Sequence, residues 1–252
     1  MKRQVEQLSP YGDRRGKAEQ VREMFDNIAP AYDFMNRAMT LGIDRRWRRR
    51  AVETLPKGED VATLDIATGT GDMAMLTRRI TGSRHITGID LSEGMLSVGR
   101  EKMARAGIPE GEVTLLQADS LSMPFADNSF DAVTVAYGVR KFADLAAGYR
   151  EMVRVMRPGA RLAVLELSTP RGLLTAPLYR LYTRCLIPLA GRMVSHDVRA
   201  YSYLPESIAA APQGEDMLTL MRSAGLTDAR ARQLTFGACT LYTAIKPTAN
   251  QS

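Results

Sequence analysis

The sequence predicts an α/β fold with a mainly parallel, doubly wound sheet. Apolar runs suited to buried strands alternate with helically spaced segments from residue 61 onward, and such alternation is typical of parallel sheets with right-handed crossovers. The first apolar run enters a turn that contains Gly69 and Gly71, and the second ends in Asp90 about twenty residues later. Glycines let a backbone approach a ligand closely, and an acid at that position can bind both hydroxyls of a ribose. These observations predict a domain that holds a nucleoside.

Helical spacing predicts an N-terminal cover of about sixty residues, of which the first twenty are polar and expected to fray. Within it, helices are expected at residues 18–31 and 32–39, and Asp44 is expected to cap a basic helix that begins near Arg45. Strands are expected at residues 62–67, 85–90, 112–117, 130–136, 161–167, 228–235 and 239–246. The intervening helices are expected at residues 72–80, 93–106 with Ser92 as cap, 145–156 and 213–224. Helically spaced leucines interrupted by prolines predict an inserted helical segment at about residues 170–211.

The composition is that of an ordinary globular protein. The chain has 252 residues, of which 45% are hydrophobic and 25% charged. Its two cysteines, Cys185 and Cys239, are too few for a disulfide framework and lack metal-like spacing, so no metal site and a reducing cytoplasm are expected. The start of the chain lacks the apolar core of a signal peptide, and no run of eighteen apolar residues predicts a membrane span.

The net charge of +6 has a local source in residues 45–50, whose sequence RRWRRR holds five arginines around the only tryptophan. A solvated helix face is the first interpretation. An anionic membrane surface is the second, because tryptophan and arginine suit the lipid interface. Nucleic acid is the third, because aromatic stacking platforms are absent elsewhere.

The glycine turn indicates the kind of nucleoside. It is not the dinucleotide fingerprint G-x-G-x-x-G, since Ala74 stands where the third glycine would be. Acids at Asp65 and Asp72 would repel a pyrophosphate but tolerate a cationic ligand, which favours S-adenosylmethionine. Asp119 follows the third strand and can accept from an adenine amino group. An ordinary strand–turn–helix corner and a turn aspartate are the structural alternatives.

Arg140 follows the fourth strand and Gly138, at the edge of the sheet where ligands bind. It has two interpretations. It is either one half of a structural ion pair or a fixed cation aimed at a developing oxyanion.

Several segments of the chain form a recognisable set. They are FDNIAPAYDFMN at residues 25–36, GIDRRW at 42–47, DIATGTG at 65–71, FDAVTVAYGVRKF at 130–142, RVMRPG at 154–159, LELSTP at 165–170 and YSYLPESI at 201–208. Together these segments resemble the quinone-biosynthesis C-methyltransferases. The resemblance covers residues 18–246. The first two segments and the last are specific to this family, whereas the nucleoside motifs are shared by many methyltransferases.

The resemblance implies a class I S-adenosylmethionine-dependent methyltransferase fold, with residues 61–252 as the methyltransferase domain and residues 1–60 as its helical cover. It implies that the ring carbon of a quinol with an isoprenoid tail attacks the sulfonium methyl. The candidate cofactor-binding residues are Asp65, Gly69, Thr70, Gly71, Asp90, Leu91, Asp119, Ser120 and Ala136. Arg140 is the candidate for stabilising the quinol oxyanion, with Tyr32 and Tyr201 as positioning groups.

The chain departs from the family pattern at three positions. It has Ala136 where the family often has serine, Lys141 where asparagine is usual, and Ala160 where glycine is usual. The serine and asparagine positions lie near the predicted reaction site. Lys141 therefore changes the expected hydrogen-bond network on the substrate side.

The Thr68-Gly69-Thr70 form resembles the menaquinone branch, so demethylmenaquinol is the implied substrate. The alternatives are a benzoquinol of the ubiquinone pathway, another small molecule, and a non-catalytic basic protein of the same fold that binds RNA. The expected partners are a lipidic quinol and the inner face of the cytoplasmic membrane, with no nucleic acid. A homo-oligomer is left open.

Overall fold

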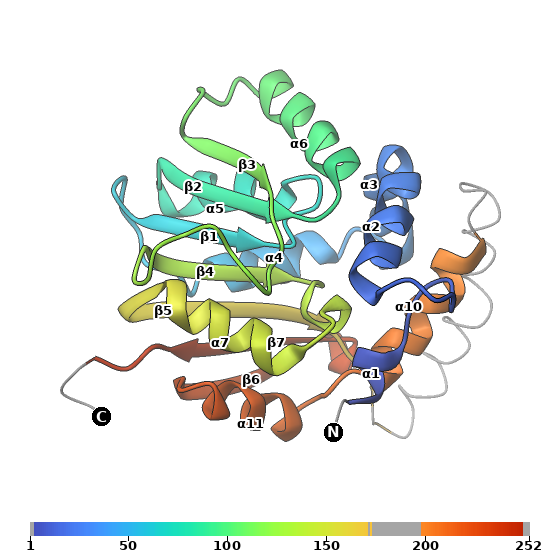
Figure 1. The fold of residues 1–252 in the computed structure, drawn as a ribbon. Coiled ribbons are helices and arrows are strands. Elements are labelled where there is room, and N and C mark those ends of the chain that lie inside the picture. Colours follow the sequence, from blue (N-terminus) through green and yellow to red (C-terminus); the bar gives the residue numbers. More distant parts are fainter. Residues whose placement is uncertain (1–2, 171, 173–197, 249–252) are drawn as a thin grey trace.

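The computed structural model describes residues 3–170, 172 and 198–248. In this part of the chain, seven strands form one sheet in the order β3-β2-β1-β4-β5-β7-β6 (Figure 1). The strands are β1 (Ala62–Ile66), β2 (His85–Asp90), β3 (Val113–Gln117), β4 (Phe130–Ala136), β5 (Met156–Leu167), β6 (Thr227–Leu234) and β7 (Cys239–Ile245). The first five strands pair in parallel, and β7 pairs antiparallel with both β5 and β6. The predicted α/β fold class is confirmed.

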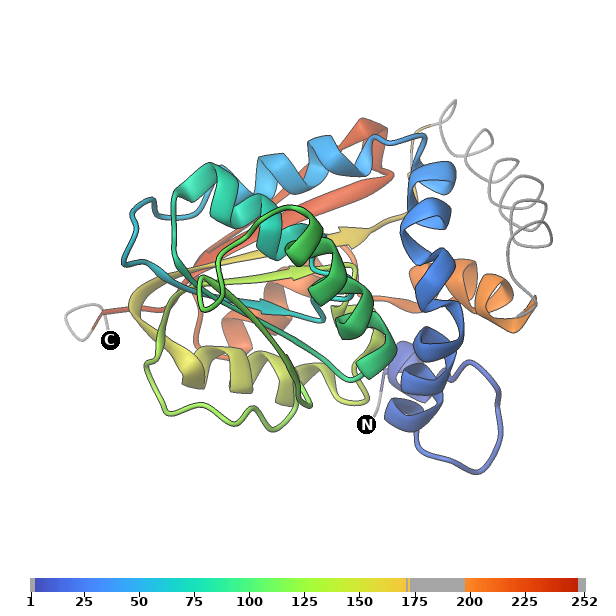
Figure 2. The same cartoon turned by 90° about the horizontal axis from the view of Figure 1, so that it is seen from above.

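Helices cover both faces of the sheet. Figure 2 shows α4 (Asp44–Val52) and α5 (Asp72–Thr81) on the side opposite α7 (Leu145–Val155). On the first face Trp47, Met73 and Leu165 belong to one buried apolar cluster, and α6 (Glu93–Arg105) extends that layer over β2 and β3. On the other face α7 and α11 (Glu215–Ser223) pack Met152 and Met221 into the largest cluster. The apolar central strands are therefore buried on both faces, as a parallel sheet requires.

Most element boundaries agree with the predictions to within two residues. The Ser92 cap is confirmed, because its side chain accepts a hydrogen bond from the Met95 amide at 3.1 Å. The main boundary error is the start of β5, which begins at Met156 instead of Arg161. The strand begins earlier than predicted because Met156 already pairs with Phe130 of β4. The register then shifts before Arg161 pairs with Ala132.

The prediction that the first twenty residues fray is wrong. Residues 4–7 form α1, in which Val5 is fully buried. The Glu6 carboxylate accepts from the Leu145 amide at the start of α7, at 3.0 Å. Lys17 begins α2 (Lys17–Ile28) and its Nζ donates to the Arg140 carbonyl at 3.1 Å. These buried polar contacts fix the start of the chain against the carboxyl edge of the sheet.

The rest of the cover consists of a 3-10 turn (Ala29–Ala31), α3 (Tyr32–Thr40) and α4. In Figures 1 and 2, α2 and α3 lie beyond one end of the strands, beside α10 (Val198–Ala210). The expected Asp44 cap is wrong, because α4 begins at Asp44 and Ile43 holds the capping position. The Asp44 carboxylate instead accepts from the Thr40 hydroxyl at 2.9 Å and pairs with Arg48.

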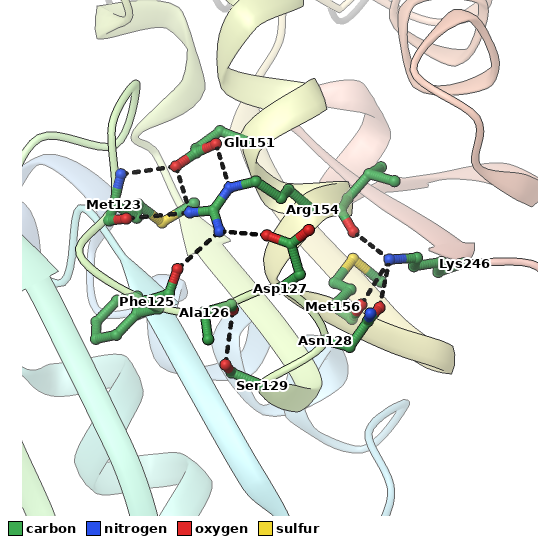
Figure 3. Close-up of polar contacts among 11 residues, drawn as sticks. Met123, Phe125, Ala126, Asp127, Asn128, Ser129, Glu151, Arg154, Met156 and Lys246 are labelled. Carbon is green, nitrogen blue, oxygen red and sulfur yellow. Dashed lines mark hydrogen bonds and ion pairs between the residues drawn. The ribbon is translucent and has the colours of Figure 1, made fainter.

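The family-like segment at residues 154–159 has a structural role at the opposite edge of the sheet. The Arg154 guanidinium donates to the carbonyls of Met123 and Phe125, at 3.0 and 2.7 Å, and pairs with Glu151 and Asp127 (Figure 3). These contacts hold the loop that leads into β4. This segment therefore fixes the fold far from the predicted site.

The expected insertion at about residues 170–211 is described only in part. Residues 198–210 form α10, while residues 171 and 173–197 lie outside the described residues. Within the part of the chain that the structure describes, no helix combines the length and apolarity needed to cross a membrane. The division into residues 1–60 and 61–252 stays a prediction.

Candidate active site

Two cavities lie beyond the carboxyl ends of the central parallel strands. The smaller, of about 50 Å³, runs along the ends of β1 and β2 and is hereafter the nucleoside pocket. The larger, of about 580 Å³, lies under α2, α3, α4 and α10 and is hereafter the large cavity. Among the described residues, Phe25, Tyr32 and Lys141 line both. These three side chains therefore form the boundary between the two cavities.

Asp90 lines the nucleoside pocket at the end of β2, as predicted. One carboxylate oxygen accepts from the Gly69 amide at 2.9 Å, and the other accepts from the Ser92 amide at 3.0 Å. Burial raises the pKa of Asp90, while these amides and the nearby Lys141 oppose the rise. Each oxygen retains a lone pair, so Asp90 can still accept from ribose hydroxyls.

Four more of the predicted cofactor residues, Gly69, Leu91, Asp119 and Ser120, line the same pocket. The Asp119 carboxylate accepts from the Leu121 amide at 2.9 Å, which is the turn contact of the structural alternative. This bond uses only one of its two oxygens, so the turn role and contact with a base are compatible. Gly69 has φ +58°, which a residue with a side chain adopts only with strain.

The remaining cofactor candidates, Asp65, Thr70, Gly71 and Ala136, do not line either cavity. The Thr70 hydroxyl instead donates to Asp33 of α3 at 2.6 Å and accepts from Lys102 of α6. Asp33 also pairs with Lys102 at 2.5 Å. These contacts tie the N-terminal cover to the glycine turn.

Asp65 stabilises the glycine turn through buried hydrogen bonds. It is 1% exposed, and its carboxylate accepts from the hydroxyls of Thr68 and Thr134 at 2.6 and 2.7 Å. Burial raises the pKa of Asp65 to about 6, although both hydrogen bonds and Arg48 oppose the rise. Asp65 therefore shapes the loop that reaches the ligand.

The raised pKa of Asp65 predicts a specific dependence of stability on pH. The native state binds the Asp65 proton more tightly than the unfolded state, so the contribution of Asp65 to the free energy of unfolding should fall as pH rises from about 4 to about 6, and stay level above that. Asp65→Asn should remove this fall and make the protein more stable than wild type by about 2 kcal/mol at neutral pH. Urea denaturation of both proteins at several pH values measures the difference. A difference that is independent of pH would contradict the assignment.

Among the described residues that line the large cavity, three carry a buried side-chain polar atom that lacks a hydrogen-bond partner. They are the hydroxyls of Tyr137 and Tyr203 and Nε of Arg140, on side chains that are 4–6% exposed. Such atoms cost free energy unless a ligand satisfies them. Tyr137 also has φ +61°, a strained conformation for a tyrosine that occurs most often at functional sites. Neither Tyr137 nor Tyr203 was predicted from the sequence as a site residue.

Arg140 fits both of its predicted interpretations. One guanidinium nitrogen pairs with buried Glu166 and donates to the Tyr137 carbonyl at 2.7 Å, which is a structural role. The same side chain lines the large cavity and keeps Nε unpartnered. Glu166 therefore orients a guanidinium that still has a donor left.

The two tyrosines predicted as positioning groups differ in what the structure describes. Tyr32 packs edge to face on Phe25, with ring centroids 5.8 Å apart, and burial raises its pKa. Tyr201 lies on α10, but its side chain is outside the part of the chain that the structure describes.

Known proteins resemble this chain over almost its whole length. Residues 14–246 match the model of the ubiE/COQ5 methyltransferase family. The chain belongs to this family. It is 46% identical to a demethylmenaquinone methyltransferase of Bacteroides fragilis over 96% of this chain and 98% of that protein. It is 44% identical to a ubiquinone/menaquinone biosynthesis C-methyltransferase UbiE of Geobacter sulfurreducens, over 91% and 90% of the two chains.

A SAM-dependent methyltransferase from Aquifex aeolicus shares the fold, with a TM-score of 0.58 and 18% identity over 79% of this chain and 89% of that one. The predicted methyltransferase family, fold and S-adenosylmethionine dependence are thereby confirmed at the level of the ubiE/COQ5 family. The residues that hold the cofactor stay a prediction.

The nucleoside pocket suits the chemistry of S-adenosylmethionine, the cofactor of the ubiE/COQ5 family. Asp90, predicted to bind the ribose, and Asp119, predicted to accept from the adenine amino group, both line it. The walls of the pocket include Val21, Arg22 and Phe25 of α2.

Proposed function

We propose that this ubiE/COQ5 family member transfers a methyl group from S-adenosylmethionine to a ring carbon of demethylmenaquinol, giving menaquinol. The observation that carries the proposal is the large cavity, whose unpartnered donors Tyr137, Tyr203 and Arg140 stand among apolar side chains. A quinol offers oxygens to such donors and an apolar ring and tail to the walls. The names of the relatives and the Thr68-Gly69-Thr70 form support the menaquinone branch.

The large cavity can favour the reactive form of the quinol. A phenol of pKa about 10 is mostly protonated at neutral pH, and its ring carbon becomes a stronger nucleophile when the oxygen is ionised. The Arg140 guanidinium can stabilise that oxyanion through Nε, while Glu166 holds the side chain in place. The Tyr137 and Tyr203 hydroxyls can orient the ring by donating to its oxygens. When bound, S-adenosylmethionine supplies an electrophilic methyl group.

Methyl transfer in vitro tests the proposal. Purified protein, S-adenosylmethionine and a short-tailed demethylmenaquinol reduced with dithionite should give the methylated quinol, identified by mass spectrometry. A demethylated benzoquinol of the ubiquinone type serves as the competing substrate. Faster turnover of the benzoquinol would contradict the menaquinone assignment, and failure with both quinols would contradict quinol methylation.

A further part of this proposal concerns how the lipidic substrate arrives. Leu41, 88% exposed, lies at the rim of the large cavity, and Phe236, 82% exposed, follows the rim residue Thr235. Exposed Arg46 lies at this rim, and Arg45, Arg49 and Arg50 of the same helix are also exposed. Exposed apolar side chains next to arginines suit an anionic bilayer surface. The protein is therefore proposed to contact the cytoplasmic face of the membrane through this rim.

The expected contribution of tryptophan to this surface is wrong. Trp47 is 6% exposed, and its indole N–H donates to the Thr235 hydroxyl at 2.8 Å. Arg48 is also buried, with its guanidinium 5.1 Å from the centroid of the Tyr137 ring. Trp47 and Arg48 lie on the face of α4 that packs against the sheet. The number of arginines in the sequence does not reveal that one of them is buried.

The double variant Leu41→Glu/Phe236→Glu should weaken binding to anionic liposomes. Wild type should co-sediment with phosphatidylglycerol vesicles at low salt and dissociate at high salt, because the attraction of exposed charges is screened. The double variant should bind at least about tenfold more weakly, since it places carboxylates at the lipid surface. Leu116→Glu, at an exposed leucine on the edge strand β3, is the control. Equal loss in the control, or no binding by wild type, would contradict this surface.

A further inference from the structure

Lys141 is the one side chain with an amine among the described residues that line both cavities. It follows Arg140 in the 3-10 turn Val139–Lys141 after β4. Its Nζ lies 3.9 Å from the centroid of the Phe25 ring. The other two boundary residues, Phe25 and Tyr32, carry no charge at neutral pH. Because a methyl group must pass from one cavity to the other, the amine lies close to the path of the reaction.

The surroundings of Lys141 disfavour its charged form. Burial is the main cause, and it lowers the pKa of Lys141 to about 7. Arg140 and Arg48 disfavour a further positive charge, whereas Asp90 and Glu166 favour it. The Phe25 ring offers only a weak cation–π contact. A sulfonium bound at this boundary would add another like charge and push the equilibrium further toward the neutral amine.

We propose that Lys141 is the proton acceptor of the reaction, taking the hydroxyl proton of the quinol at the boundary between the two cavities. This inference rests on the proposed methyl transfer. This assignment separates two tasks: Lys141 removes the proton, and neighbouring Arg140 stabilises the oxyanion that results.

The reaction balances in protons and electrons with Lys141 as the proton acceptor. The Nζ lone pair takes the hydroxyl proton, and the electron pair of the O–H bond moves into the ring. The ring carbon beside that oxygen bonds to the methyl carbon, and the electrons of the broken C–S bond stay on the sulfur. Loss of the ring proton to water restores the aromatic ring, and the oxygen takes a proton back from Nζ. One proton is released overall, and the amine is ready for the next turnover.

Single-turnover kinetics of Lys141→Met test the role. The wild-type rate should rise with pH through an inflection near pH 7 or below, because the neutral amine accumulates above the pKa of Lys141. Lys141→Met should be slower by about a hundredfold and lose that inflection, because it keeps the length but not the amine. Lys141→Asn should share the loss of the inflection. Lys57→Met removes an exposed lysine far from the site and should match wild type. An unchanged pH profile in Lys141→Met would overturn the proposal.

Cofactor binding gives a second readout that needs no turnover. Wild type should bind S-adenosylmethionine about tenfold more tightly at pH 8 than at pH 6, relative to S-adenosylhomocysteine, which lacks the sulfonium charge, because the Lys141 ammonium repels the sulfonium. Lys141→Met should lose this difference while still binding S-adenosylhomocysteine, which shows that it is folded. A pH-independent ratio in wild type would contradict the proposed position of the amine. If the pH-dependent binding is observed but wild type methylates neither quinol, the proposed function is wrong, while the position of the Lys141 amine beside the sulfonium is supported.

Discussion

Arg140→Ala is expected to lower both the stability of the protein and its rate of methyl transfer. The side chain is 5% exposed and pairs with Glu166, which is 2% exposed. Removing one partner of a buried pair leaves the other charge without compensation, at a cost of about 3–5 kcal/mol in the free energy of unfolding. The same substitution removes the unpartnered donor from the large cavity, so kcat should fall more than KM rises. Thermal melts and single-turnover rates measure the two effects.

The double variant Arg140→Met/Glu166→Gln separates stability from catalysis. It removes both charges and keeps much of the buried volume, so most of the lost stability should return. The rate should stay low, because no guanidinium faces the quinol oxygen. Arg140→Lys should recover only part of the rate, since it keeps the charge but not the fork of donors. A double variant with wild-type turnover per folded molecule would remove Arg140 from the catalytic residues.

Asp90→Ala should weaken S-adenosylmethionine binding by roughly 1–3 kcal/mol, the cost of leaving hydrogen-bond partners unpaired. The carboxylate accepts hydrogen bonds from the amides of Gly69 and Ser92, so it also fixes the shape of the pocket. Asp90→Asn keeps one acceptor oxygen and should lose less affinity. Isothermal titration calorimetry with S-adenosylmethionine and S-adenosylhomocysteine measures the loss, which should be similar for both because both carry the ribose.

A matched control for Asp90→Ala is Asp131→Ala. Asp131 is also an acid on a sheet strand, but it accepts from the Ala62 amide at the opposite ends of β1 and β4. It should therefore affect stability without changing cofactor affinity per folded molecule. Unchanged affinity in Asp90→Ala would exclude this residue from the ribose site.

The sequence predicted those parts of the site that local patterns specify. Gly69 and Asp90 follow from spacing along two adjacent parallel strands, and both line the nucleoside pocket. The Ser92 cap follows from its place before a helical run. Arg140 was predicted from its position after β4, and the structure adds its partner Glu166, which comes from a neighbouring strand.

The sequence could not predict features that depend on contacts between distant segments. The start of the chain looked polar, but Glu6 and Lys17 find buried partners more than a hundred residues away. Trp47 looked suited to a membrane surface, yet it packs inward against the β7 side of the sheet. Tyr203 became a candidate only once α10 was placed over the large cavity. The YSYLPESI segment contains both Tyr201 and Tyr203, and its sequence alone does not show which of the two faces the cavity.

The quinone content of cells tests the central claim most directly. Cells of the source organism that lack this protein should lose menaquinone and accumulate demethylmenaquinone, seen by mass spectrometry as a quinone pool lighter by one methyl group. Wild-type protein supplied in trans should restore menaquinone, and Asp90→Ala should restore it poorly. Unchanged menaquinone in cells without the protein would contradict the assignment of this chain to demethylmenaquinol methylation.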